Sequence, residues 1–382
     1  MAQPTNYGFN EDAAALKDVA IKFFRDKFSA NTLHNLVAKN SDLDRKVECN
    51  WDQALWQEII ELGWLMTAVP ERVDGLGMPV VAVASLVEQA GLAAFPSPLL
   101  ATLSSTYILS ACESNSDHKN ADDALRSILD GKTISYASCN QQGSWEHQDT
   151  DAVVENNALD GCSYFVQDAK KVDYFLVKAQ TNGETGLYLV HANAEGLTIS
   201  PDTIYDLTRD QATLHFDNVS IEKSAIIANA GTATPVLKAA TPALLVLLTA
   251  DMCGAAEWQL QTTAEYAKTR VQFDKPIGFF QAVKHPLAEF MVGLDQARSH
   301  LYNAACAIDH EPELAEKYAR MAKAVANEMA IFGSSKSVQL HGGIGFTWEC
   351  YIHMYMKRQM HSQLILGDAY YQRAKIAETL FA

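Results

Sequence analysis

The spacing of apolar residues changes twice along this chain of 382 residues, and these two changes constrain the fold most. Up to about residue 116, apolar residues recur with helical spacing, as in DAAALKDVAIKFFRDKF and WDQALWQEIIELGWL. From about 131 to 225 they fall in short β-branched and aromatic runs separated by Asn-Asn, Asp-Gly, Asn-Gly and Glu-Gly turns, which predicts antiparallel strands. From residue 232 the helical spacing returns.

This order predicts an α+β protein with three parts. We expect a helical N-terminal domain over residues 1–125, a small antiparallel β barrel or sandwich over 126–230, and a C-terminal four-helix bundle over 231–382. The last bundle helix is expected over about 350–380. Because no helix separates the predicted strands, a βαβ nucleotide-binding unit is disfavoured.

The net charge of −16 limits the partners of the chain. Nucleic acids and anionic membranes would be repelled, so an anionic ligand would need a locally basic site or backbone N–H groups. The start, MAQPTNYGFNEDAAALKD, has neither the basic nor the apolar region of a signal peptide, and the apolar run ALLVLLTA (243–250) is too short to span a bilayer. We therefore expect a cytoplasmic protein with no membrane span and no bound nucleic acid.

Cysteines and histidines do not indicate a metal site. The seven cysteines, at 49, 112, 139, 162, 253, 306 and 350, include no CxxC pair, which is typical of reduced and mostly buried thiols. His341, His353 and His361 form no i, i+4 pair and have no carboxylate at ligand spacing. We expect ordinary bundle histidines and no metal.

Two C-terminal segments have the composition of a phosphate site. In RVQFDKPIGFFQ (270–281), an arginine near the end of a predicted helix precedes a turn, which suits either a bidentate bond to phosphate or a helix C-cap. In QLHGGIGF (339–346), Gly342 and Gly343 let the backbone approach a ligand, and the N-terminus of the next helix would hold an anion. A close helix crossing would also explain these glycines.

Together these segments resemble the acyl-CoA dehydrogenase family of flavoproteins, over nearly the whole chain. The family's loop PEEYGGLG is similar to PERVDGLG here, and its R-x-x-F-G…Q and Q-x-x-G-G-x-G segments lie about seventy residues apart. The matching residues here are Arg270, Phe273, Gln281, Gln339, Leu340, His341, Gly342 and Gly343. The resemblance implies that they bind the adenosine diphosphate half of FAD, partly across a subunit interface. Asp274 departs from the family's usual Gly and adds a negative charge beside the diphosphate unless Lys275 offsets it.

The resemblance is weaker in the β domain, where the family holds the flavin ring. Its T-E-P-x-x-G-S-D loop matches SCNQQGSW (138–145), which keeps two hydroxyls, Ser138 and Ser144, but loses the Glu, Pro and Asp. Its W-I-T strand matches FVQ, where Phe165 keeps the aromatic face and Gln167 replaces the Thr. The resemblance implies that these four residues contact the flavin.

The position of the catalytic base is the largest departure. The family's reaction removes an α proton from an acyl-CoA thioester while a hydride leaves the β carbon, and this needs a carboxylate of raised pKa in a dry site. Most members carry this base as Glu in Y-E-G-T, which matches ILGD with Leu366 in place of the Glu; others use the first bundle helix, where PALLV (242–246) has no acid. Two substitutes remain. Asp368 would serve unless it only caps a helix, and Asp251 would serve unless it only bonds a neighbouring helix.

These residues lead to two main hypotheses. The first is an FAD-dependent acyl-CoA dehydrogenase, a homo- or hetero-tetramer that oxidises an acyl-CoA substrate and reduces an electron-transfer acceptor. The second is a subunit without a base that supports a partner's FAD, as in bacterial members that form hetero-oligomers for bulky or steroid acyl-CoA thioesters. A third, a helical binding protein without flavin, leaves the paired cofactor segments unexplained.

Overall fold

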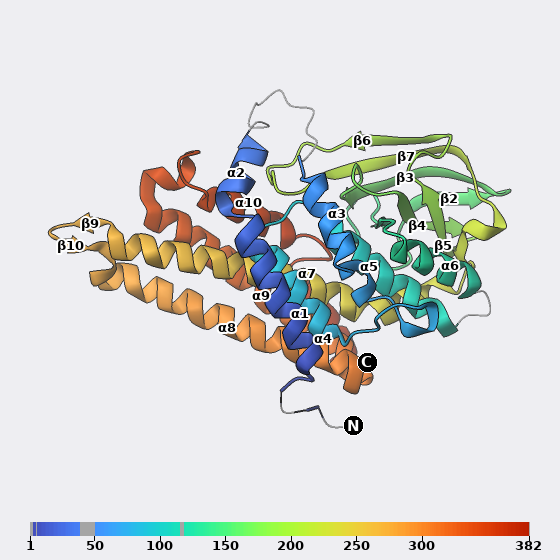
Figure 1. Cartoon of the computed structure of the whole chain (residues 1–382). Helices are drawn as coiled ribbons and strands as arrows, with labels where there is room; N and C mark the ends of the chain where they lie inside the picture. The colour runs from blue at the N-terminus through green and yellow to red at the C-terminus, as the bar shows by residue number, and fades with distance from the viewer. Residues whose placement is uncertain (1–2, 5, 39–49, 115–117, 382) are drawn as a thin grey trace.

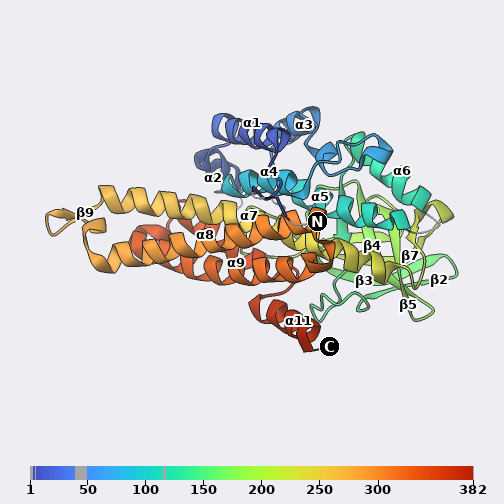
Figure 2. The same cartoon turned by 90° about the horizontal axis from the view of Figure 1, so that it is seen from below.

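The computed structural model describes residues 3–4, 6–38, 50–114 and 118–381. A long helical bundle carries a β domain at one end and a layer of shorter N-terminal helices along one side (Figure 1). The α+β fold and its order of helical, β and helical parts are therefore confirmed. Figure 2 shows that the β9–β10 hairpin projects from the end of the bundle opposite the sheet.

The N-terminal layer is built from six α-helices among the described residues. They are α1 (Glu11–Lys27), α2 (Ala30–Ala38), α3 (Gln53–Glu61), α4 (Val80–Leu92), α5 (Leu99–Ser110) and α6 (His118–Leu129). Residues Val80 to Gly91 of α4 are all buried, because this apolar helix packs between α1 and α7. A Cβ at Gly91 would lie 2.2 Å from the backbone oxygen of Asp251, so the glycine lets the two helices cross closely.

The β domain is one eight-stranded sheet with the order β6-β7-β3-β2-β4-β5-β8, and β1 pairs with β4. The strands are β1 (Ile134–Ala137), β2 (Asp151–Glu155), β3 (Ala158–Gln167), β4 (Tyr174–Thr181), β5 (Glu184–His191), β6 (Leu197–Pro201), β7 (Gln211–Ser220) and β8 (Ile226–Ala228). Most pairs are antiparallel, as predicted, but β1 and β2 both pair in parallel with β4. Sequence spacing does not reveal such pairings because they join strands that are distant in the chain.

The C-terminal bundle contains α7 (Ala233–Thr269), α8 (Gln281–His310), α9 (Pro312–His341), α10 (Ile352–Ser362) and α11 (Ala369–Phe381). A short hairpin of β9 (Val271–Gln272) and β10 (Lys275–Pro276) follows α7. The single helix predicted over 350–380 is instead two helices. The break falls at Leu366 and Gly367, whose φ angles of 59° and 95° cannot continue a right-handed helix.

Helix α7 runs through the core of the molecule. It has 37 residues, and within the described parts of the chain it alone has the length and hydropathy of a membrane span. However, 83% of its apolar window is buried inside the protein, which is typical of a core helix. The expectation from sequence considered the run 243–250 alone, whereas the helix that contains it is much longer.

Candidate active site

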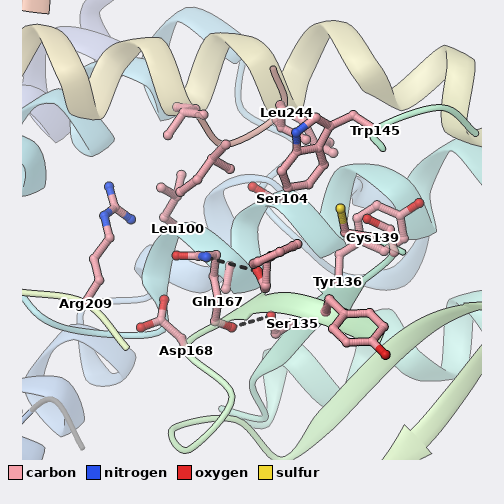
Figure 3. A pocket seen from close by; sticks show the side chains of 17 residues that line it. Leu100, Ser104, Ser135, Tyr136, Cys139, Trp145, Gln167, Asp168, Arg209 and Leu244 are labelled. Atoms are coloured by element: carbon pink, nitrogen blue, oxygen red, sulfur yellow. Dashed lines mark hydrogen bonds between the residues drawn. The ribbon is translucent and has the colours of Figure 1, made fainter. Parts of the chain in front are cut away.

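A largely apolar cavity, here called the site cavity, lies where the β domain meets α5 and α7 (Figure 3). It encloses about 660 Å³ of empty space, including its mouth. Its lining comes from four regions of the chain: Leu100, Ala101 and Ser104 of α5; Ser135, Tyr136, Ser138, Cys139 and Trp145 at and after β1; Tyr164, Phe165, Gln167, Asp168 and Arg209 of the sheet; and Leu244, Leu248, Ile365 and Leu366 of the bundle. Apolar walls of this kind exclude water and suit an acyl chain or a flat aromatic ring.

Strand β3 presents Phe165 and Gln167 to this cavity. The pairing of β3 with β7 shifts register between Ser163 and Val166, and Phe165 has a φ of 57°, so a bulge turns its ring out of the sheet. The side-chain nitrogen of Gln167 donates to the Phe165 oxygen and to Gln211, at 3.0 Å each. Its Oε1 is buried without a hydrogen-bond partner. This unused acceptor is available to a ligand N–H group.

The loop after β1 is only partly as predicted. Ser138 is buried and lines the cavity. Ser144 does not line it, because its hydroxyl donates to Asp149 at 2.7 Å and its backbone N–H donates to Asn140 at 2.9 Å. Trp145 instead fills part of the cavity (Figure 3). We did not predict this role, although the sequence signal was present: Trp145 occupies the position of an Asp in the family loop.

Leu366 reaches the cavity from the turn between α10 and α11. Buried polar side chains hold this turn: Gln372 donates to the Leu366 oxygen at 2.5 Å, and Lys323 donates to the oxygens of Ser362 at 3.2 Å and Gln363 at 3.1 Å. Lys323 is fully buried, which lowers its pKa to about 7. The turn therefore fixes an apolar side chain at the position where most members of the family that this sequence resembles carry the base.

Carboxylates are scarce at the site. Among the described residues that line the cavity, Asp168 is the single carboxylate, and it forms an ion pair with Lys171 at 2.7 Å. Asp368 is exposed and caps α11, since its Oδ1 accepts from the N–H of Tyr371 at 2.8 Å. It lies in a neighbouring cleft rather than in the site cavity. Its geometry matches the capping alternative and not a base held in a dry site.

Asp251 is likewise placed by structural contacts. It is 2% exposed and accepts from Arg209 Nη2 at 2.5 Å and from two nitrogens of Arg358, one of them Nε at 3.3 Å. Two guanidinium groups stabilise its charged form. It also lies outside the lining of the site cavity. These contacts match the alternative in which Asp251 only bonds neighbouring elements, as part of a structural ion pair.

The residues of the two glycine- and arginine-containing segments meet at the opposite end of the bundle. Tyr266, near the end of α7, stacks on His341 at the end of α9 with ring centroids 4.4 Å apart. This contact brings Arg270, the C-cap of α7, to the same end as Gly342. The first residue of α8, Gln281, lies there too, just after the hairpin.

Glycines 342 and 343 border open space. Apart from its chain neighbours, a Cβ added at either would have no atom of the described residues within 4 Å, so a close helix crossing does not explain them. The helix expected to follow is a 3₁₀ segment, Gly342–Phe346, and α10 starts only at Ile352. An α-helical N-terminus is therefore not available to hold an anion directly after these glycines.

The hairpin turn explains the departure at Asp274. Phe273 and Asp274 have φ angles of 53° and 57°, the left-handed values of a two-residue hairpin turn, where Gly is the least strained residue. Phe273 is 87% exposed at the tip. Its ring is therefore available to another chain.

The two groups of predicted cofactor residues are far apart within one chain. Leu248 lines the site cavity and Arg270 ends the same helix 22 residues later, a separation of about 33 Å along α7. Ser138, Phe165 and Gln167 lie at the cavity, whereas Arg270, Gln281, Gly342 and Gly343 lie at the far end. One dinucleotide does not reach both groups in a single chain.

The three predicted bundle histidines have local partners. His341 stacks on Tyr266, His353 packs edge-on against Trp348, and His361 lies 3.3 Å from Asp206. Within the described ranges, no group of three or more His, Cys, Asp or Glu side chains could hold a metal ion. Cysteines 112, 139, 253 and 306 are buried free thiols; Cys49 lies outside the described residues.

Comparison with known proteins identifies the family. Residues 10–132 match the N-terminal domain of acyl-CoA dehydrogenases and residues 246–381 match the C-terminal domain. The chain is 30% identical over 318 residues to acyl-CoA dehydrogenase IpdE2 of Mycobacterium tuberculosis, covering 83% of each chain. It therefore belongs to the acyl-CoA dehydrogenase family of FAD-dependent oxidoreductases, which confirms the resemblance seen in the sequence.

Two solved structures have the same fold. The ChsE4–ChsE5 complex from Mycobacterium tuberculosis matches with a TM-score of 0.84 at 24% identity, covering 98% of each chain. Butyryl-CoA dehydrogenase from Megasphaera elsdenii matches with a TM-score of 0.84 at 21% identity, covering 98% of this chain and 99% of the other. These likenesses establish the shared architecture.

The residues present fit FAD, the cofactor of this family. The orphaned Gln167 oxygen and the out-turned Phe165 ring form a polar edge and an aromatic face, which suit a flavin ring. At the far end, the open space beside Gly342 suits the dinucleotide of another chain. The negative charge of Asp274 would weaken the binding of a diphosphate there.

Proposed function

We propose that this chain takes part in the α,β-dehydrogenation of an acyl-CoA thioester. Bound FAD would supply the acceptor for the hydride. The apolar walls of the site cavity, including Leu100, Leu244 and Leu248, would exclude water and hold the acyl group, and Phe165 and Gln167 would orient the flavin ring. The observation that supports this most is the unpaired Gln167 oxygen inside an otherwise apolar cavity in a chain of this family.

We further propose that this chain is the subunit without a base in a hetero-oligomer, where the partner removes the α proton. The observation that favours this second function is Leu366 at the base position, together with a cavity whose single described carboxylate is already paired with Lys171. Abstraction of an α proton needs a carboxylate that is free to accept it. Leucine does not provide one, and Asp368 is exposed to water.

The separation of the two groups of cofactor residues supports an assembly, which we propose is a tetramer. Each FAD would bind the cavity of one chain and the Arg270 and Gly342 end of another. We propose a bulky, steroid-derived acyl-CoA as substrate, because one similar structure is a steroid acyl-CoA dehydrogenase variant (26% identity, TM-score 0.82). We also propose that the electron acceptor is an electron-transfer protein, that the reaction belongs to lipid degradation, and that the protein is cytoplasmic.

The test is to purify the chain alone and with a co-expressed second member of the family, and to measure flavin absorbance and acyl-CoA-dependent reduction of a ferricenium acceptor. We expect flavin in both assemblies or in the mixed one, and turnover only in the mixed one. Turnover by the chain alone that Asp368→Asn abolishes would reinstate Asp368 as base. A colourless protein in every preparation would contradict the dehydrogenase proposal itself.

A second variant tests the base position directly. Leu366→Glu places a carboxylate on the turn that already points into the cavity. We expect it to confer measurable turnover on a flavin-containing preparation of this chain alone, whereas Leu366→Gln, which has the same shape without the charge, stays inactive. Equal inactivity of both variants in a preparation that binds FAD would mean that more than the base is missing.

A further inference from the structure

A second cavity, here called the polar cavity, adjoins the site cavity. The two share Tyr136, Ser138, Trp145, Leu244 and Leu366, and the polar cavity encloses about 990 Å³, including its mouth. Its remaining lining differs in character, because it includes four cations, Lys178, Lys238, Arg320 and Lys375, and three carboxylates, Glu146, Glu316 and Glu378. A ligand with an apolar group in the site cavity would therefore extend into a charged compartment.

Three of these cations are already paired or lie in water. Arg320 bonds Glu316 at 2.8 Å, Lys375 bonds Glu146 at 2.6 Å, and Lys238 is exposed. Their charges are offset by carboxylates or by solvent. The fourth cation differs from these three, because it is buried and has no ion pair with any described residue.

That fourth cation, Lys178, is buried on β4 and is only 1% exposed. It donates to the backbone oxygen of Glu146 at 2.7 Å and forms no ion pair with any described residue. An ammonium group has three N–H donors, so two remain for a ligand. A buried lysine with spare donors and no carboxylate in direct contact is costly in an empty cavity, and an oxygen-rich ligand would reduce that cost.

We propose that Lys178 is the residue by which the polar cavity recognises the phosphorylated pantetheine arm of a thioester substrate, and that binding of this arm is accompanied by proton uptake. The proposal rests on the proposed function, in which the acyl end of the same substrate occupies the site cavity. Coenzyme A and carrier proteins share this arm. One similar protein is an L-prolyl-[peptidyl-carrier protein] dehydrogenase from Pseudomonas fluorescens (28% identity over 58% of this chain).

The charges around Lys178 make the proton uptake specific to it. Burial lowers its pKa to about 8, against the opposing attraction of Cys139, Asp149 and Glu146. His147, also in the lining, has a pKa lowered to about 4 by burial and by the charges of Lys178 and Arg320. Near pH 8 His147 is therefore neutral and far from titration. A bound phosphate would raise the pKa of Lys178, so the half-protonated lysine would take up protons until it is fully protonated.

The experiment is titration calorimetry of the full chain with free coenzyme A and, separately, with 4′-phosphopantetheine. Measurements at pH 8 in two buffers of different ionisation enthalpy give the protons taken up per ligand. We expect about half a proton for coenzyme A, because a group with a pKa near 8 is half protonated at that pH. Affinity should fall about tenfold from pH 7 to pH 9 as the free lysine loses its proton.

Two matched variants distinguish the effect of the buried Lys178 from the effect of positive charge in the cavity in general. Lys178→Met should weaken coenzyme A binding at least tenfold and abolish the proton uptake. Lys238→Met removes the same charge from the rim of the same cavity and should keep both the uptake and an affinity within about threefold of wild type. Because the ionisation of the ligand is common to all three proteins, their differences isolate the lysine.

The possible outcomes decide the proposal. Wild-type chain that does not bind coenzyme A, or binds it without proton uptake, overturns it, and so does a folded Lys178→Met variant with unchanged uptake. If Lys178→Met does not fold, the wild-type pH series decides alone. Equal affinities for the two ligands mean that the shared arm suffices; tighter coenzyme A binding means that its nucleotide adds contacts. Flavin content measured in parallel tests the dehydrogenase proposal separately.

Discussion

Replacement of Asp251 by Asn separates its structural role from the catalytic one. The carboxylate lies between Arg209 and Arg358 with 2% exposure, and the substitution would leave two buried guanidinium groups with one remaining carboxylate, Asp206, 3.7 Å from Arg209. Removing one partner of a buried ion pair costs about 3–5 kcal/mol. Because Asp206 still offsets part of the charge, we expect a loss of about 4 kcal/mol, a large part of the stability of an ordinary domain.

The assay is urea unfolding followed by far-UV circular dichroism, with Asp368→Asn as the matched control. Asp368 is exposed and only caps α11, and Asn caps a helix about as well as Asp, so this replacement should leave the free energy of unfolding nearly unchanged. An Asp251→Asn variant with the same urea midpoint as the wild type would contradict the structural role of this ion pair. A variant of wild-type stability that loses acyl-CoA-dependent turnover would show that Asp251 is a base after all.

Three further predictions follow from single residues. Gly343→Val should leave the urea midpoint of the isolated chain unchanged, because the added atoms meet open space. The same variant should lower flavin retention, measured by absorbance, and assembly, measured by gel filtration. Unchanged assembly would mean that no second chain approaches there. Gly367→Ala should cost about 2 kcal/mol or more, since Gly367 has a φ of 95° and a Cβ would lie 2.2 Å from Tyr371, whereas a cost near zero would show that the turn is not fixed. Burial, as the largest cause, lowers the pKa of His353 to about 4, so the unfolded chain binds more protons than the folded chain between pH 6.5 and 4. The free energy of unfolding should therefore fall by about 1–3 kcal/mol as the pH drops through this window. His353→Gln should flatten this pH profile, and an unaltered profile would contradict the lowered pKa.

The order of helical and β parts was predictable because it depends on local spacing of apolar residues. The break at Leu366 was not. ILGDAYYQRAKIAETL has good helical composition, and its left-handed turn is held by Lys323 and Gln372, whose side chains reach it from α9 and α11. Sequence placement identified Leu366 as the residue at the base position, but only the fold shows that its side chain faces the cavity.

Tertiary partners account for the remaining differences at the site. Arg209 and Arg358 lie 42 and 107 residues from Asp251 in sequence, so nothing local indicated that this acid is paired. Ser144 kept the hydroxyl of the family loop, yet the nearby Asp149 binds it. Lys178 looked like an ordinary strand residue, and only the packing of the loop carrying Glu146 over it reveals a buried cation.

We propose that two chains complete each flavin site, because its two groups of residues lie at opposite ends of one long helix. Native mass spectrometry of the purified protein, with flavin counted in each species, tests this most directly. We expect FAD to be retained only by dimers or larger assemblies, with one FAD for every two chains if a partner supplies the base. A monomer that carries one tightly bound FAD would contradict it.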